Sequence, residues 1–262
     1  MLKLKQIIRS HGVFRGFRFH NPKGGSTLFG KEQLMIISGL QKLTLLDYPG
    51  KTAAIVFTYG CNFRCPFCHN ALLVTEKMQD TIPEEEVLSF LEKRKGLLDA
   101  VCITGGEPTL QKGLREFIIK VREMGYAVKL DTNGTNPVLL DTLLTEGLLD
   151  YVAMDIKNAP DKYSLTAGTD VDLNNILKSI DLIKSKAPDY EFRTTMTREL
   201  HSEADIISAA ELAGKTSKYY LQQFKDSGSL ISGGHTPWDV NELHKLKDRL
   251  LSLSFNASIR ES

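Results

Sequence analysis

The stretch TAAIVFTYGCNFRCPFCHN, residues 52–70, decides the fold of this chain. Its first seven residues form a short apolar run rich in β-branched side chains, which is typical of a buried strand. Cys61, Cys65 and Cys68 follow at once, in a Cys-x3-Cys-x2-Cys spacing. Because ligands gather at the carboxyl ends of parallel strands, this arrangement predicts a binding site directly after the first strand of an α/β fold.

The same alternation of short apolar runs and amphipathic segments continues downstream. It predicts parallel strands joined by right-handed helical crossovers. A complete eight-stranded barrel takes about 250 residues, and we count only six units, so we expect an open, partial (β/α)6 barrel. The predicted strands are residues 52–58, 100–104, 127–131, 151–156, 191–196 and 219–224, and the predicted helices are 81–95, 111–124, 138–146, 173–186, 203–213 and 240–251.

The composition is that of an ordinary globular protein. The 262 residues carry 33 Lys and Arg against 32 Asp and Glu, and this balance disfavours a dedicated nucleic-acid-binding protein. No apolar run approaches the roughly 18 residues that a membrane span needs. The N-terminus also lacks the apolar core of a secretory signal. We therefore predict a cytoplasmic protein without nucleic-acid or membrane partners.

Residues 1–34 differ from the rest of the chain. They contain seven basic residues against one acid, Glu32, and they show no helical or strand period. One interpretation is a disordered basic arm that precedes a domain of residues 35–262. The other is that translation starts at Met35, so that this segment lies upstream of the native protein.

The clustered cysteines indicate a metal or cluster site. Three thiolates on a tight loop can bind three irons of a four-iron cluster. Without a fourth nearby cysteine, one iron keeps an open position, by the logic that separates catalytic from structural zinc sites. The alternative is a zinc site completed by His69 or Cys102, although the loop lacks the second half of a zinc ribbon. Cys102, inside an apolar run, is predicted to be a small buried residue.

These motifs resemble a known superfamily. A Cys-x3-Cys-x2-Cys loop after the first strand, with aromatic Phe67 before the third cysteine, is similar to that of radical S-adenosylmethionine enzymes. The flanking residues LDYPGK (46–51) and GCNFRCPFCHN (60–70) resemble the activating proteins of anaerobic ribonucleoside-triphosphate reductase and, more broadly, glycyl-radical activases. The resemblance covers about residues 35–225. It implies one 4Fe–4S cluster, held by the three cysteines of the loop, and S-adenosylmethionine as cofactor.

The resemblance also implies a reaction. An electron from a flavodoxin- or ferredoxin-like donor would cleave S-adenosylmethionine to methionine and a 5′-deoxyadenosyl radical. The radical would then take a Cα hydrogen from a glycine of a partner glycyl-radical enzyme, expected to be anaerobic ribonucleoside-triphosphate reductase. Two alternatives stay open: a radical enzyme that acts on a small molecule or an RNA base, and a non-catalytic iron–sulfur or zinc carrier or sensor.

Polar residues at the ends of other predicted strands are the remaining candidates. Gly105 and Gly106 let the backbone approach a ligand closely, and Glu107 could accept a hydrogen bond from a charged amine. The resemblance implies that this segment holds the amino group of S-adenosylmethionine. Asp155 and Lys157 point the same way from one strand. They form either a structural ion pair or, as the resemblance favours, part of the cofactor site.

Later strand ends complete the predicted site. Arg193 and Thr195 share a strand face and are expected near the ribose or the carboxylate of the cofactor, and Gln222 near its adenine. The full set predicted to bind cofactor is Phe67, Cys68, His69, Gly105, Gly106, Glu107, Asp131, Thr132, Asn133, Asp155, Lys157, Arg193, Thr195 and Gln222.

Overall fold

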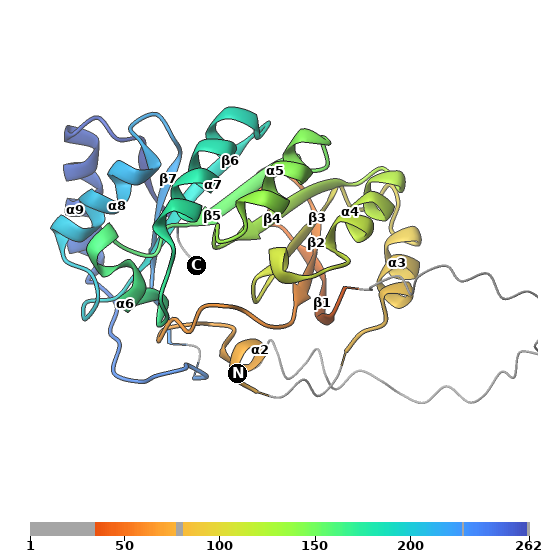
Figure 1. Ribbon diagram of the computed structural model, residues 1–262, viewed down its shortest axis with the longest axis horizontal. Coiled ribbons are helices and arrows are strands. Elements are labelled where there is room, and N and C mark those ends of the chain that lie inside the picture. Colours follow the sequence, from red (N-terminus) through yellow and green to blue (C-terminus); the bar gives the residue numbers. More distant parts are fainter. Residues whose placement is uncertain (1–34, 77–80, 227, 261–262) are drawn as a thin grey trace, which may run out of the picture.

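The computed structural model describes residues 35–76, 81–226 and 228–260, so the predicted arm of residues 1–34 lies outside the described residues. Within them, one eight-stranded sheet follows chain order (Figure 1). β1 pairs antiparallel with β2, and every later pair is parallel. The strands are β1 (Ile37–Thr44), β2 (Ala53–Thr58), β3 (Ala100–Gly105), β4 (Ala127–Thr132), β5 (Tyr151–Asp155), β6 (Tyr190–Met196), β7 (Tyr219–Gln223) and β8 (Ala257–Arg260).

Most helices line the outer side of this sheet, whereas the short helix after the cysteine loop lies on the pocket side, where Val74 lines the pocket (Figure 1). Two of the longer ones begin with a capping box, Ser202 with Asp205 and Asp239 with Glu242, which satisfies free N–H groups of the first turn. The helices are α2 (Ala71–Thr75), α3 (Glu84–Glu92), α4 (Leu114–Glu123), α5 (Pro137–Thr145), α6 (Tyr163–Ala167), α7 (Leu173–Lys186), α8 (Glu203–Ala213) and α9 (Val240–Ser252), with short 3₁₀ turns at Pro108–Leu110 and Pro160–Lys162.

The two faces of the sheet differ in chemistry. In β4, Val128 and Leu130 pack into the main core that the helices share, whereas Lys129 and Asp131 point to the opposite, inner face. This follows from the period of two along a strand. On the same inner face a second, small apolar cluster includes Tyr48, Cys102 and Tyr151. The inner face therefore has an apolar part and a polar part, and the polar part holds the site.

The predicted α/β fold with a partial barrel is confirmed. The six predicted strands correspond to β2–β7, and the predicted bounds of α7 and α8 match the structure. Two strands at the sheet edges were not predicted. The apolar pattern of β1 is interrupted by Gly39 and Gln41 and its register with β2 shifts twice, while β8 has only four residues.

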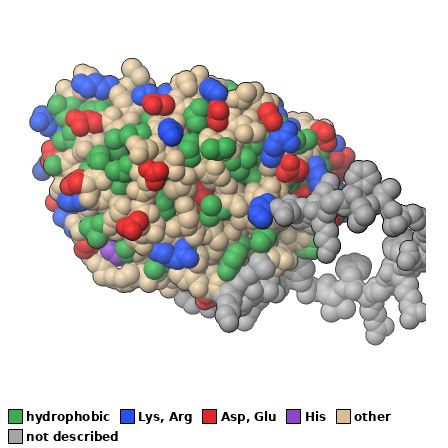
Figure 2. Space-filling model, viewed as in Figure 1, with side chains coloured by type: hydrophobic (Ala, Val, Ile, Leu, Met, Phe, Trp, Pro, Cys, Tyr) green, Lys and Arg blue, Asp and Glu red, His purple; other side chains and the backbone are tan. Residues whose placement is uncertain are grey.

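The surface is chemically mixed. On the face shown in Figure 2, acidic, basic and hydrophobic side chains are interspersed, in keeping with a net charge of +1. No helix among the described residues combines the length and the apolar character that a membrane span requires.

Candidate functional site

A pocket of about 690 Å³ lies on the inner face, between the cysteine loop and the ends of the strands. All the residues that the sequence predicts for the site line it, from Cys61 in the loop to Gln222 at the end of β7. Residues that the prediction missed line it too, among them Asp47 from the β1–β2 connection, Lys129 and Arg260. Lys129 precedes Asp131 by two residues, so strand alternation would have placed both on this face.

The cysteine loop is clamped from two sides. Arg64 N donates to Ala167 O at the end of α6 (2.7 Å), and Ser232 N, from the loop after β7, donates to Pro66 O (3.0 Å). Gly168 has φ of +66°, and a Cβ at this position would lie 2.2 Å from Arg64 O. The close approach of α6 to the cysteine loop therefore requires glycine at this position.

The sequence predicts that the Gly105–Gly106 turn approaches a ligand, and the close neighbour that the structure shows is the backbone of the cysteine loop. A Cβ on Gly106 would lie 1.9 Å from Gly60 O. Glu107 N donates to the same Gly60 oxygen at 2.8 Å. The turn after β3 thus holds the base of the cysteine loop.

The donor set fits a four-iron cluster with one open position. Cys61, Cys65 and Cys68 carry free thiols and line the pocket. Cys102 is 1% exposed, lies in the small apolar cluster and is not among the lining residues, which confirms it as a small buried residue and disfavours it as a fourth ligand. Burial raises the pKa of Cys61 to about 12 and raises the pKa values of the other two thiols.

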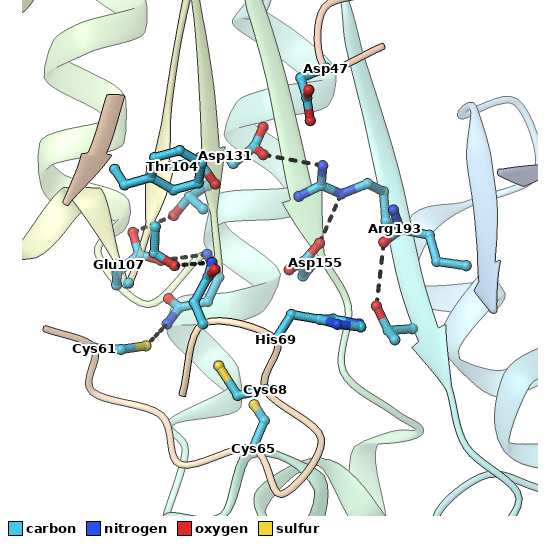
Figure 3. Close-up of a pocket in the computed structure, with 18 of the residues that line it drawn as sticks. Asp47, Cys61, Cys65, Cys68, His69, Thr104, Glu107, Asp131, Asp155 and Arg193 are labelled. Carbon is cyan, nitrogen blue, oxygen red and sulfur yellow. Dashed lines mark hydrogen bonds and ion pairs between the residues drawn. The ribbon is translucent and has the colours of Figure 1, made fainter. Parts of the chain in front are cut away.

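His69 lines the pocket, and its ring points away from the three thiols (Figure 3). Its ring packs 5.9 Å from the ring of Phe224. Phe67, predicted beside the cofactor, is buried, and its ring contacts those of His201 and Phe224 at 6.2 and 6.5 Å. These aromatic contacts support the cysteine loop from the side of β7.

Glu107 is the centre of a network of hydrogen bonds from uncharged donors. Its carboxylate is 1% exposed. Oε1 accepts from Thr109 N, Thr109 Oγ1 and Thr132 Oγ1 at 3.0, 2.6 and 2.8 Å, and Oε2 accepts from Asn133 N at 2.7 Å. Burial raises the pKa of Glu107, and these hydrogen bonds partly offset that rise. Most of its accepting capacity is therefore taken up by protein donors, and Oε2 keeps room for one further donor.

A network of charges occupies the other side of the pocket (Figure 3). Arg193 donates from Nε to Asp155 Oδ1 (2.9 Å) and from Nη1 to Asp131 Oδ2 (3.3 Å). Lys157 Nζ lies 3.0 Å from Asp155 Oδ2, and Lys129 Nζ lies 2.5 Å from Asp131 Oδ1. The predicted structural ion pair of Asp155 and Lys157 thus exists, and both residues also line the pocket.

These charges stay ionised despite their burial. Burial alone would raise the pKa of Asp155, but Arg193 and Lys157 outweigh it and hold that pKa well below its ordinary value. Burial would lower the pKa of Lys157, and Asp155 more than reverses this, so that its pKa is raised. Lys157 and Arg193 are thus cations that line the pocket while paired with aspartates, and an anionic ligand group could contact them there.

β8 closes the polar part of the inner face. Arg260 forms a two-pronged ion pair with the fully buried Glu191 and stacks over the Tyr220 ring at 4.3 Å. Tyr151 Oη also donates to Glu191, at 2.8 Å. Arg260 was missed because the sequence analysis did not predict the short strand that carries it.

Thr195 from β6 and Gln222 from β7, both predicted site residues, are brought together at the far side of the pocket. Thr195 Oγ1 donates to Gln222 Oε1 at 3.4 Å. Both line the pocket, with the amide nitrogen of Gln222 left for another acceptor.

Comparisons with known proteins indicate which proteins this chain resembles. The model of the Radical SAM superfamily matches residues 55–213. A Methanocaldococcus jannaschii protein, assigned by its name to the glycyl-radical enzyme activating enzymes, is 39% identical over 197 residues, which cover 72% of this chain and 80% of that protein. The 7-carboxy-7-deazaguanine synthase of Clostridium acetobutylicum is 27% identical over 67% of this chain and 74% of its own length. A radical SAM methyltransferase structure from Sphaerobacter thermophilus shares the fold, with a TM-score of 0.65 and 14% identity over 83% of this chain and 68% of that one.

Proposed function

The chain belongs to the radical SAM superfamily, and on this premise we propose that it is an activating enzyme that forms a glycyl radical in a partner protein. Because the chain belongs to this superfamily, it is a radical SAM enzyme. The alternative of a non-catalytic carrier or sensor is therefore rejected. The observation that carries the finer proposal is the 39% identity to the Methanocaldococcus jannaschii protein, because the alignment spans most of both chains.

The chain's own residues suit the cofactors that this proposal requires. Cys61, Cys65 and Cys68 would hold a 4Fe–4S cluster, and the absence of a fourth cysteine from the described pocket lining leaves one iron for S-adenosylmethionine. When bound, the cluster supplies one electron that cleaves S-adenosylmethionine to methionine and a 5′-deoxyadenosyl radical, which takes hydrogen from a glycine Cα.

The polar groups of the pocket divide the task of orienting S-adenosylmethionine. Lys157 and Arg193 would bind its carboxylate, since both stay charged although their side chains are only 16% and 11% exposed. The turn at Gly105–Gly106 and the free position on Glu107 Oε2 would receive its amino group. Thr195 and Gln222, across the pocket, would contact ribose and adenine.

The partner is proposed on the residues that flank the cysteine loop. The resemblance of residues 43–70 to reductase-activating proteins favours anaerobic ribonucleoside-triphosphate reductase as the glycyl-radical enzyme. A flavodoxin- or ferredoxin-like protein would supply the electron. A protein loop could reach the pocket because the sheet has two edges, β1 and β8, and does not close on itself in the described residues.

The first experiment measures 5′-deoxyadenosine formed by anaerobically reconstituted protein with dithionite and S-adenosylmethionine. Cys65→Ala should abolish the product, and Cys102→Ala, a buried cysteine outside the loop, should retain it. Partner protein carrying deuterium at glycine Cα is then added. Deuterium in the 5′-deoxyadenosine, together with a glycyl-radical signal in electron paramagnetic resonance, supports the proposal. Abundant 5′-deoxyadenosine without either result would contradict it.

A small-molecule substrate is the second candidate. It is favoured by the similarity to 7-carboxy-7-deazaguanine synthase over most of both chains. In that case a deazaguanine precursor would raise 5′-deoxyadenosine formation and no candidate partner protein would. The deuterium experiment separates the two candidates, because only one of them takes hydrogen from a protein glycine.

A further inference from the structure

Three side chains join the cysteine loop to the turn after β4 in a closed ring of hydrogen bonds. Asn62 Nδ2 donates to Thr135 Oγ1 at 2.9 Å, and Thr135 Oγ1 donates to Asn133 Oδ1 at 2.7 Å. Asn133 Nδ2 completes the ring by donating to Asn62 Oδ1 at 2.8 Å. Within the ring each side chain donates one hydrogen bond and accepts one, so all three hydrogen bonds run in the same direction around it.

The backbone fixes the orientation of the Asn133 amide. Thr135 N donates to the same Asn133 Oδ1 at 3.1 Å, and a backbone N–H can only donate. The oxygen of the amide must therefore face Thr135, and its NH₂ group must face the cysteine loop. The turn that carries Asn133 is held as well, because Asn133 N donates to Glu107 Oε2 at 2.7 Å and Ser179 Oγ donates to Gly134 O at 2.7 Å.

The second N–H of this amide is directed at a sulfur. Asn133 Nδ2 lies 3.9 Å from Cys61 Sγ, a contact drawn in Figure 3. The same sulfur accepts from Phe63 N at 3.3 Å. Asn133 is only 6% exposed, so little water competes for its amide.

We propose that Asn133 is a positioning residue that donates a hydrogen bond to the sulfur of Cys61 and so sets the reduction potential of the bound cluster, with Asn62 and Thr135 holding its amide in place. The inference rests on the proposed function, because it requires the cluster. Hydrogen bonds to cluster sulfurs are among the main determinants of cluster potential. An N–H donor stabilises the more negative, reduced cluster more than the oxidised one, so its loss lowers the potential.

The test is an anaerobic redox titration of reconstituted protein without S-adenosylmethionine, read by electron paramagnetic resonance, with iron content measured in parallel. Asn133→Leu removes the donor and should shift the midpoint potential to a more negative value. Thr135→Val keeps the donor but removes one of the three hydrogen bonds that orient its amide, and should shift the potential in the same direction by less. Ser179→Ala is the matched control, since it removes a buried hydrogen bond to the same turn but leaves the three hydrogen bonds that orient the Asn133 amide. Its potential should equal that of the unaltered protein.

The outcomes separate this inference from the proposed function. A potential that is equal in the unaltered protein, Asn133→Leu and Ser179→Ala, at equal iron content, would overturn the inference and leave the cluster in place. If Asn133→Leu holds no cluster, an unchanged potential in Thr135→Val would overturn the inference. Failure of the unaltered protein to hold a four-iron cluster would overturn the proposed function, and the inference with it.

Discussion

The two sides of the pocket are built from different interactions. On the β3–β4 side, Glu107 accepts four hydrogen bonds from neutral donors and fixes the turns that support the cysteine loop. On the β5–β6 side, Arg193 joins Asp131 and Asp155, and Lys157 adds a second cation. The uncharged donors around Glu107 fix the geometry of the turns, whereas the ionic side places cations where a ligand can contact them. The difference suggests that one side positions the cluster and the other binds the charged cofactor.

The largest effect is expected from breaking the ionic side. Arg193→Met removes a cation that Asp131 and Asp155 share, and leaves each aspartate with one lysine partner. Removal of one partner of a buried ion pair costs about 3–5 kcal/mol, and we expect a cost at the lower end of this range because the lysines remain. Urea unfolding would measure the change in the free energy of unfolding. Arg198→Met is the control, because its pair with Glu242 is exposed and such pairs contribute about 0–1 kcal/mol. Equal costs for the two variants would contradict the comparison.

The neutral side should be less sensitive to a change of one residue. Glu107→Gln keeps one accepting oxygen but turns an NH₂ group toward buried donors, at a cost of about 1–3 kcal/mol. Glu199→Gln is a matched control, since Glu199 also accepts from a threonine N–H and hydroxyl but is exposed. Its substitution should stay within about 0.5 kcal/mol. A Glu107→Gln protein as stable as this control would show that the network is dispensable.

A third substitution sharpens the functional side of the comparison. Lys157→Met should weaken binding of S-adenosylmethionine about tenfold, or ~1.4 kcal/mol, because the variant loses a charge-assisted contact to the carboxylate. Calorimetry with the cluster-loaded enzyme would measure it. Lys162→Met, which removes a surface cation paired with Asp205, should leave the affinity unchanged. Unchanged affinity in Lys157→Met would place the carboxylate elsewhere.

The smallest expected effect is a difference in pH dependence. The pKa of Asp155 is lowered in the fold, so its contribution to stability is present above its ordinary pKa of about 4 and is lost as the pH falls below that value. The pKa of Glu107 is raised, so its contribution is fullest below its ordinary pKa of about 4 and declines as the pH rises through the raised value. Urea unfolding at several pH values should therefore show Arg193→Met losing the acid-side slope and Glu107→Gln losing the opposite slope. Identical slopes in both variants would contradict this.

Sequence patterns predicted the parts of the fold that repeat. The apolar runs of β2–β7 and the caps and periods of α7 and α8 are local signals, so their positions follow from composition and spacing. β1 and β8 lie at the sheet edges, where register shifts and short length weaken those signals. The residues that line the candidate site could be predicted because the fold brings the carboxyl ends of parallel strands together. Cys61, Cys65 and Cys68 also lie close together in sequence.

The contacts within the site were not predictable in the same way. The ring of Asn62, Asn133 and Thr135 depends on the conformations of two loops that are separated by 60 residues or more along the chain, and no spacing rule encodes it. Lys129 could have been found, because it repeats the two-residue spacing of Asp155 and Lys157. Arg260 could not, since it lies on β8, the short edge strand that was not predicted.

The contact between Gly60 and Gly106 has a consequence for the evolution and redesign of this scaffold. Since a single methyl group at position 106 would lie 1.9 Å from the backbone of residue 60, residue 106 cannot carry a side chain that distinguishes substrates. Substrate specificity can diversify in the surrounding loops, while the backbone contact between residues 60 and 106 stays the same. In a library of single substitutions, we would then expect residue 106 to accept almost no substitution and the accepted substitutions to lie along the sheet edges.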